Sequence, residues 1–116
     1  MKTILIAEDN DSNFILMSYL LKKQYNIIRA INGVKAVECA KNGGIDIILM
    51  DIKMPEMDGL EATRIIKKSM PDMPIIALTA NAFESDREQA FEAGCDDFLP
   101  KPVNAEVCLA TIAKYI

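Results

Sequence analysis

The chain has 116 residues, of which 51% are hydrophobic and 26% charged, with a formal net charge of −4 at pH 7. This length and composition predict one globular domain with a real core and exclude a disordered chain. The acidic balance argues against direct binding of nucleic acid, which requires clustered lysine and arginine. The sequence has no signal-type start and no apolar run long enough to span a bilayer, so we expect a cytoplasmic protein without a membrane partner.

The residue types that are missing exclude several kinds of chemistry. The chain contains no histidine, so a Ser-His-Asp triad, a histidine metal site and a phosphohistidine within this chain are all excluded. Cys39, Cys95 and Cys108 lack the spacing of a metal site. We interpret them as small core residues, with a redox pair as the alternative.

Strand and helix patterns alternate five times along the chain. The predicted strands are Thr3–Glu8, Asn26–Ala30, Ile45–Asp51, Pro74–Thr79 and Asp97–Pro100. The predicted helices are Asp11–Lys23, Gly33–Lys41, a third that begins at Asp58-Gly59 and ends before Pro71, Glu84–Ala93 and Asn104–Tyr115. We find no internal repeat or linker, so residues 1–116 predict a single domain.

Capping residues mark several of these helix boundaries. Asp11 is a candidate N-cap of the first helix, and Asn10 is also interpreted as a capping residue. Asp58 is predicted to begin the third helix, with Glu61 in position for a capping box. Asn104 is predicted to cap the fifth helix, and Asn42-Gly43-Gly44 to end the second.

The regular alternation predicts an α/β fold, a three-layer, doubly wound parallel sheet with helices on both faces, because parallel strands need crossover connections. The first, third and fourth strands are nearly pure apolar runs, as expected for strands that are covered on both faces. Ligands on such sheets bind outside the carboxyl ends of the strands, where the strand order reverses. The site is therefore expected at that edge of the sheet.

Polar residues follow four of the predicted strands where each strand ends. The pair Glu8-Asp9 ends the first strand, Asp51 the third, Thr79 the fourth, and Lys101 follows the fifth. An acid pair, a further acid, a hydroxyl and a lysine at neighbouring strand ends suit a cation together with a phosphoryl group.

The motifs around these residues identify a family. They read Ala7-Glu8-Asp9-Asn10, Asp51-Ile52-Lys53-Met54-Pro55-Glu56-Met57-Asp58-Gly59, Ala77-Leu78-Thr79-Ala80 and Lys101-Pro102. In this order, and each at a strand end, they resemble the receiver domain of two-component response regulators over essentially the whole chain. The phrases around Asp51 and Thr79 look most like receivers of hybrid sensor kinases.

The resemblance implies a flavodoxin-like sheet with strand order 2-1-3-4-5. It also implies that Asp51 accepts a phosphoryl group from a phosphohistidine on a histidine kinase or a histidine phosphotransfer protein. A divalent cation, Mg²⁺ or Mn²⁺, must then offset the repulsion between the carboxylate and the phosphoryl group. By resemblance, its ligands are Asp9, Asp51, Glu8 through water, and the backbone carbonyl of Lys53.

Further residues take roles from the same resemblance. Thr79 and Lys101 would bind phosphoryl oxygens, and a cis peptide before Pro102 would turn the lysine inward. Thr79 and Phe98 would form a conformational switch that is read by a downstream target on the fourth helix, fifth strand and fifth helix.

The phosphoryl lifetime is expected to depend on Lys53 and Asn81, which should border the path of the hydrolytic water. The resemblance implies a signalling phosphoacceptor that catalyses its own phosphotransfer and slow autodephosphorylation, and no other enzyme activity.

Three alternatives remain at this point. A phosphatase of the haloacid dehalogenase class also uses a strand-end aspartate and Mg²⁺, but it needs a second aspartate where this chain has Lys53. A flavodoxin-type flavin protein shares the topology, but Glu8-Asp9 would repel its phosphate. A degenerate receiver would bind a partner without being phosphorylated, although the key residues are intact here.

Overall fold

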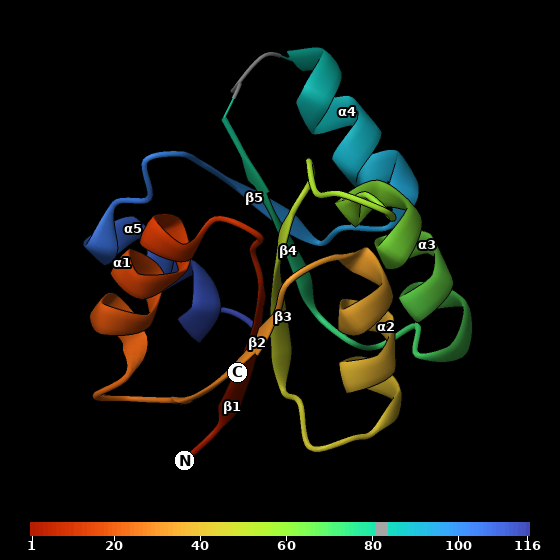
Figure 1. The fold of residues 1–116 in the computed structure, drawn as a ribbon. Helices are drawn as coiled ribbons and strands as arrows, with labels where there is room; N and C mark the ends of the chain where they lie inside the picture. Colours follow the sequence, from red (N-terminus) through yellow and green to blue (C-terminus); the bar gives the residue numbers. More distant parts are fainter. Residues whose placement is uncertain (81–83) are drawn as a thin grey trace.

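The computed structural model describes residues 1–80 and 84–116, which form a parallel sheet covered by helices on both faces (Figure 1). The strands are β1 (Thr3–Ala7), β2 (Asn26–Ala30), β3 (Ile47–Asp51), β4 (Ile75–Thr79) and β5 (Asp97–Pro100). The helices are α1 (Asp11–Leu21), α2 (Gly33–Lys41), α3 (Gly59–Ser69), α4 (Glu84–Ala93) and α5 (Ala105–Ala113). Within the described part of the chain, no helix combines the length and apolar character needed to cross a bilayer.

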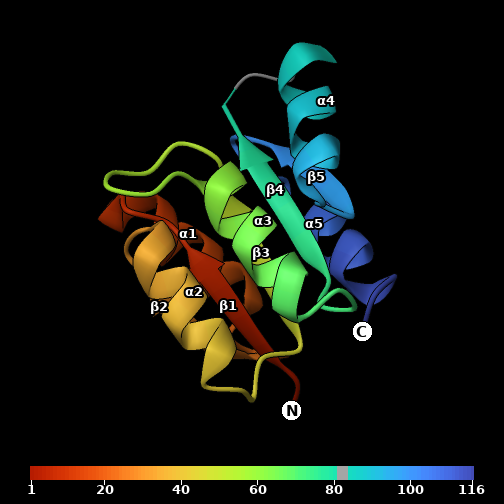
Figure 2. The same ribbon diagram turned by 90° about the vertical axis from the view of Figure 1, so that its right-hand side faces the viewer.

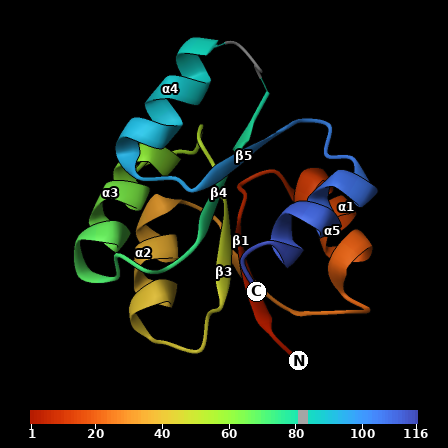
Figure 3. The same ribbon diagram turned by 180° about the vertical axis from the view of Figure 1, so that it is seen from behind.

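The sheet has the strand order β2-β1-β3-β4-β5, and all its neighbouring strands are parallel. On one face α3 lies between α2 and α4 (Figure 2). On the other face α1 and α5 lie together (Figure 3). The predicted doubly wound fold and strand order are therefore confirmed. The strand order reverses at β1, since β2 lies on one side of β1 and β3 lies on the other, which places the expected binding edge beside β1 and β3.

Alternating side chains of the buried strands supply both layers of the core. Ile4 and Ile6 of β1 belong to the apolar cluster that includes Leu21 and Ile112, whereas Leu5 belongs to the cluster beneath α2 and α3. All three β1 residues are fully buried. A slip of one residue would exchange these two sets, so packing on both faces fixes the register that brings the strand ends level.

The structure distinguishes the two residues interpreted as caps of α1. Asn10 is the N-cap, which confirms its capping role, and Asp11 is not; the Asn10 side chain accepts a hydrogen bond from the Asn13 N–H at 2.9 Å. Asn10 has the extended backbone that an N-cap requires, with φ −84° and ψ 120°, whereas Asp11 is already helical. Asp11 instead forms an ion pair with Arg29 at 2.8 Å.

The predicted caps at Asp58 and Asn104 and the end of the second helix are confirmed. Asp58 accepts a hydrogen bond from the Glu61 N–H at 2.9 Å, and Asn104 accepts one from the Val107 N–H at 3.1 Å. Helix α2 ends at Lys41, and the following glycines adopt the positive φ angles that only glycine takes readily.

Cys95 and Cys108 are buried, in agreement with their predicted role as core residues, and Cys39 is partly buried. Burial raises the pKa of Cys108 to about 11. Its side chain is therefore a neutral thiol at physiological pH.

The loop between β3 and α3 is held by close backbone contacts. The Gly59 N–H donates to the Ile52 carbonyl at 2.8 Å, and the Gly33 N–H donates to the Met57 carbonyl at 3.0 Å. Glu56 adopts a left-handed φ of 66°, and its carboxylate accepts a hydrogen bond from the Asn32 amide at 3.4 Å. The loop that follows Asp51 is therefore fastened to the first turns of both α2 and α3.

Replacing Gly59 by alanine tests this close packing. A Cβ at Gly59 would overlap the Asp51 carbonyl oxygen. Helix propensity alone would make the substitution stabilising, but overlap with backbone should instead lower the free energy of unfolding by about 1–3 kcal/mol. Urea unfolding measures the change. A more stable Gly59→Ala protein would show that α3 does not press against the end of β3.

Candidate functional site

Three carboxylates converge where β1 and β3 end. Asp51 is the last residue of β3, and Glu8 and Asp9 directly follow β1. One carboxylate oxygen from each lies within 4.8 Å of the others. Glu8 and Asp51 are 0% and 5% exposed, whereas Asp9 is exposed at the rim. This set of oxygen donors fits Mg²⁺ or Mn²⁺, which prefer carboxylates and retain water ligands.

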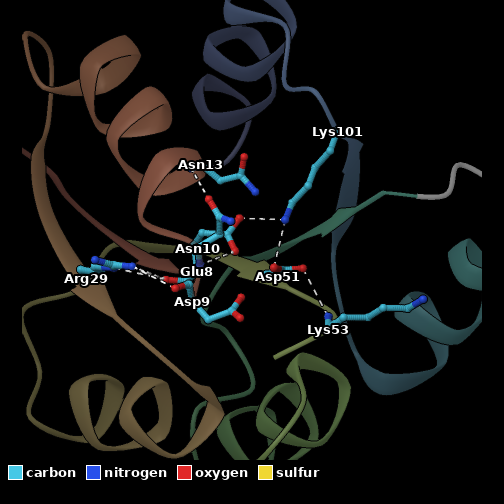
Figure 4. Close-up of polar contacts among 8 residues, drawn as sticks. All are labelled: Glu8, Asp9, Asn10, Asn13, Arg29, Asp51, Lys53 and Lys101. Atoms are coloured by element: carbon cyan, nitrogen blue, oxygen red, sulfur yellow. Dashed lines mark hydrogen bonds and ion pairs between the residues drawn. The ribbon is translucent and has the colours of Figure 1, made fainter. Parts of the chain in front are cut away.

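Lys101 bridges the two buried acids (Figure 4). Its ammonium donates to Glu8 Oε1 at 2.7 Å and to Asp51 Oδ2 at 2.9 Å. The Lys101 N–H donates to the Thr79 carbonyl at 2.7 Å, and the peptide bond between Lys101 and Pro102 is cis. The lysine side chain therefore reaches the acids from the end of β5, on the opposite side of β4 from Asp51.

The pKa values reflect the opposing effects of burial and charge. Burial raises the pKa of Glu8, and the hydrogen bond and negative charge of Asp51 raise it further, against the opposing effect of Lys101. Burial alone would lower the pKa of Lys101, but its hydrogen bonds to Glu8 and Asp51 prevail and raise it. The lysine is therefore a fixed cation at neutral pH, and the acids around it retain an excess of negative charge that attracts a further cation.

The second oxygen of Asp51 is held by the backbone of the following loop. Oδ1 accepts a hydrogen bond from the Lys53 N–H at 3.2 Å. The Lys53 side chain is exposed and extends away from Asp51 (Figure 4). Both Asp51 oxygens thus have defined partners, one from a lysine ammonium and one from a backbone amide.

A cavity of about 380 Å³ opens beside Asp51. Its lining includes Thr79 at the end of β4, the Lys101 side chain, and Asp86 of α4. Thr79 is only 5% exposed. The structure therefore brings Asp51, Thr79 and Lys101 to one cavity that is much larger than the roughly 30 Å³ occupied by a water molecule in the liquid.

Phe98 lies outside this cavity lining and packs against α4. Its ring meets Phe91 edge-on with centroids 6.3 Å apart, and the Arg87 guanidinium lies 5.1 Å from the Phe98 centroid. The side chain is half-buried. Asn81, the other residue expected beside the site, lies outside the described residues.

The sequence did not point to Arg29 as a residue of this region. It lies in the edge strand β2, where a charged side chain is ordinarily expected to be exposed to solvent. In the structure its guanidinium donates to the Glu8 and Asp9 carbonyls (Figure 4). Only the parallel pairing of β2 with β1 makes this contact evident.

An apolar face of α1 borders the site. Ile15, Leu16 and Tyr19 are 64%, 49% and 66% exposed. Leu16 also lines a small hollow that continues to Glu8 and Lys101. An apolar surface therefore adjoins the acidic site.

A sequence model described as the response regulator receiver domain matches residues 4–113. The chain belongs to this family. This receiver domain is 41% identical over 128 residues to hybrid signal transduction histidine kinase B of Dictyostelium discoideum, covering 97% of the chain and 6% of that protein. It is 36% identical over 118 residues to the polar-differentiation response regulator DivK of Brucella anthropi, covering 99% of the chain and 96% of that protein. The chain thus spans a small part of the hybrid kinase and almost all of DivK.

Solved receiver structures match the fold closely. The receiver domain of the sensor histidine kinase PA1611 from Pseudomonas aeruginosa has a TM-score of 0.92 at 36% identity, covers 98% of this chain and 96% of its own, and holds a magnesium ion in its active site cleft. The Ssk1 receiver of Saccharomyces cerevisiae, in complex with the histidine phosphotransfer protein Ypd1, has a TM-score of 0.92 at 31% identity, with coverages of 98% and 88%.

Membership of this family places the chain in two-component signalling, as a domain of phosphorelay signal transduction and not a classical enzyme. The predicted resemblance to response regulator receivers is confirmed, and one of the relatives is a hybrid kinase. The phosphatase and flavin-protein alternatives are set aside by the same finding.

Removing the Lys101 ammonium should destabilise the metal-free receiver. Lys101→Met leaves two buried carboxylates without their cation, so we expect the free energy of unfolding at pH 7 to fall by about 3 kcal/mol. When folding raises the pKa of a carboxyl, the folded protein loses stability as the pH rises through that pKa. Acidification should therefore reduce the difference in unfolding free energy between Lys101→Met and wild type. Bound Mg²⁺ should reduce the same difference, because it also offsets the negative charge. Urea unfolding with and without Mg²⁺, at pH 5 and pH 7, measures these effects.

Lys114→Met is the matched control, because Lys114 pairs with Asp97 at 3.6 Å and its side chain is 65% exposed. Such an exposed pair should contribute less than about 1 kcal/mol. Equal losses in the two variants would contradict a special role for the Lys101 contacts.

Proposed function

We propose that this receiver accepts a phosphoryl group from a partner's phosphohistidine onto a carboxylate oxygen of Asp51. The observation that carries this proposal is that Asp51 belongs both to the acidic cluster and to the cavity lined by Thr79 and Lys101. An Asp51 oxygen forms a bond to phosphorus as the phosphorus–nitrogen bond breaks, and the electron pair of that bond returns to the imidazole. The product is an acyl phosphate on Asp51.

The acidic cluster is proposed to hold Mg²⁺ or Mn²⁺ through Asp9, Asp51, a water on Glu8, and the backbone carbonyl of Lys53. When bound, the cation offsets the negative charge of the nucleophile and of the phosphoryl oxygens. Its role here is supported by the magnesium ion in the PA1611 receiver and by the clustered carboxylates of this chain.

Lys101 and Thr79 are proposed to bind the phosphoryl oxygens. The Lys101 ammonium lies 2.9 Å from an Asp51 oxygen. A short movement within the same cavity would bring it to an oxygen of a phosphoryl group bound to Asp51. The Thr79 hydroxyl would donate to another oxygen. Both groups then act as hydrogen-bond donors to charge that arrives with the phosphoryl group.

A partner must bring its phosphohistidine to the mouth of this cavity. The Ypd1–Ssk1 complex supports a histidine phosphotransfer protein as the class of partner, with a histidine kinase as the other candidate donor. The exposed apolar face of α1 adjoins the mouth and is the surface along which we place this approach.

The downstream target is proposed to read α4, β5 and α5, where Phe91 and Val107 are 40% and 51% exposed. Thr79 and Phe98 remain the predicted switch residues between the site and this face. We also retain residues 1–116 as a single receiver domain in the cytoplasm as part of the proposal.

Phosphorylation should require Asp51 and a divalent cation. Incubation with acetyl phosphate and Mg²⁺ should add one phosphoryl group, detected by intact-protein mass spectrometry. Asp51→Asn and EDTA should each abolish it. Asp58→Asn is the matched control, because Asp58 lines the same cavity but caps α3, a role that asparagine also performs. A wild-type protein that folds, binds Mg²⁺ and gains no phosphoryl group would instead support the degenerate receiver.

The Lys53 side chain is predicted to slow loss of the phosphoryl group. It is exposed at the cavity, and it is long enough to lie across a phosphoryl group and exclude the attacking water. Lys53→Ala should therefore speed hydrolysis several-fold, a change of about 1 kcal/mol in the barrier. Phosphate release from purified phosphoprotein measures the rate, with Lys68→Ala as a control in the last turn of α3. An unchanged or slower rate in Lys53→Ala would remove the side chain from this role.

A further inference from the structure

The loop that carries Glu8 and Asp9 is held from the neighbouring strand by Arg29. The Arg29 Nε and Nη2 atoms donate to the Glu8 carbonyl at 3.2 and 3.1 Å, and Nη2 also donates to the Asp9 carbonyl at 3.3 Å. The Glu8 N–H donates to the Ala30 carbonyl at 3.0 Å, beside Arg29. Strand β2 therefore binds the backbone of both acids.

Helix α1 fixes the other side of the guanidinium. Asp11 Oδ1 forms an ion pair with Nη2 at 2.8 Å, and the Arg29 Cζ lies 4.7 Å from the centroid of the Phe14 ring. The Arg29 side chain is only 24% exposed. An arginine that is stacked on a ring and donates hydrogen bonds from two nitrogens, Nε and Nη2, has few remaining conformations, so it provides a firm attachment for the loop.

We propose that Arg29 is a positioning residue for the metal-binding acids. By holding the Glu8 and Asp9 carbonyls toward β2, it leaves the two carboxylates directed at Asp51, as Figure 4 shows. This inference rests on the proposed function, since it concerns the cation that phosphotransfer requires. The effect is preorganisation, because a loop that is already fixed loses less conformational freedom when the cation binds.

The positive charge of Arg29 acts in the opposite direction to its hydrogen bonds. A cation near the site repels Mg²⁺, so charge alone would make Arg29 unfavourable for metal binding. Asp11 lies next to the guanidinium and offsets much of that charge. The hydrogen bonds to two adjacent carbonyls should therefore dominate. If they do, removing Arg29 weakens Mg²⁺ binding; if charge repulsion dominates, removing Arg29 strengthens it.

Two substitutions separate the explanations. Arg29→Gln removes the charge and the fork, and Arg29→Lys keeps the charge but cannot donate to both carbonyls with the same geometry. We expect both to weaken Mg²⁺ binding about tenfold, as measured by isothermal titration calorimetry on the unphosphorylated protein. Tighter binding by Arg29→Gln, or wild-type binding by Arg29→Lys, would overturn the positioning role.

A second readout separates positioning from a general loss of structure. The Mg²⁺ concentration for half-maximal phosphorylation by acetyl phosphate should rise in both variants, whereas the rate at saturating Mg²⁺ should stay near that of wild type. A lower saturating rate with unchanged Mg²⁺ dependence would overturn the inference. Thermal unfolding without Mg²⁺ checks that each variant is folded, and amide signals of Asp9 and Asn10 should shift most in an NMR comparison.

Asp11→Asn is the control for charge, because it removes the ion pair that offsets the guanidinium charge and leaves the contacts of Arg29 with the two carbonyls. Since the Asp11 side chain is 83% exposed and solvent screens its charge, we expect Mg²⁺ binding to weaken by less than about twofold. A tenfold loss in Asp11→Asn would assign the effect to charge and contradict the inference. If the wild-type protein itself fails to bind Mg²⁺ or to gain a phosphoryl group, the proposed function fails; if it does both and the Arg29 variants match it, only the role of Arg29 fails.

Discussion

Repulsion among buried carboxylates is the constraint around which the site is arranged. Glu8 and Asp51 are almost fully buried and lie close to Asp9. Lys101 makes this arrangement stable by donating to both buried acids. The single Lys101 ammonium does not neutralise all three carboxylates of the cluster, so a net negative charge remains. A site of this kind is stable enough to fold without a metal and still attracts a divalent cation.

The sheet supplies the geometry that this balance needs. Parallel pairing brings the ends of β1, β3 and β4 to one edge, and Lys101 returns to that edge from β5. Residues that are 93 positions apart in the sequence, Glu8 and Lys101, thus form a 2.7 Å hydrogen bond. Core packing on both sides of the sheet fixes the strand register, so the electrostatics of the site depend on apolar contacts that are remote from it.

Much of this arrangement could be predicted from the sequence, because it is written in local patterns. Apolar runs predicted the strands, the caps at Asp58 and Asn104 predicted helix starts, and the polar residues at strand ends predicted which side chains lie together in the candidate site. The sequence did not decide between Asn10 and Asp11 as the cap of α1, because both are good capping residues and only the backbone angles distinguish them. Arg29 was missed because its partners are the backbone carbonyls of Glu8 and Asp9, which follow another strand. Every residue has a backbone carbonyl, so the sequence does not show which of them accepts such a hydrogen bond.

Because the loop after Asp51 is held in place, the two sides of Asp51 are expected to differ in how easily they move. Gly33 and Gly59 leave no space between that loop and the helices beneath it, and Glu56 is held by Asn32. The backbone of the loop that follows Asp51 is therefore expected to move little when Asp51 is modified. Any strain introduced at Asp51 is expected to pass to the opposite flank, where Thr79 and the aromatic cluster of Phe91 and Phe98 lie. Tight packing at Gly33 and Gly59 would thus confine a conformational change at Asp51 to the side of the domain that contains Thr79, Phe91 and Phe98.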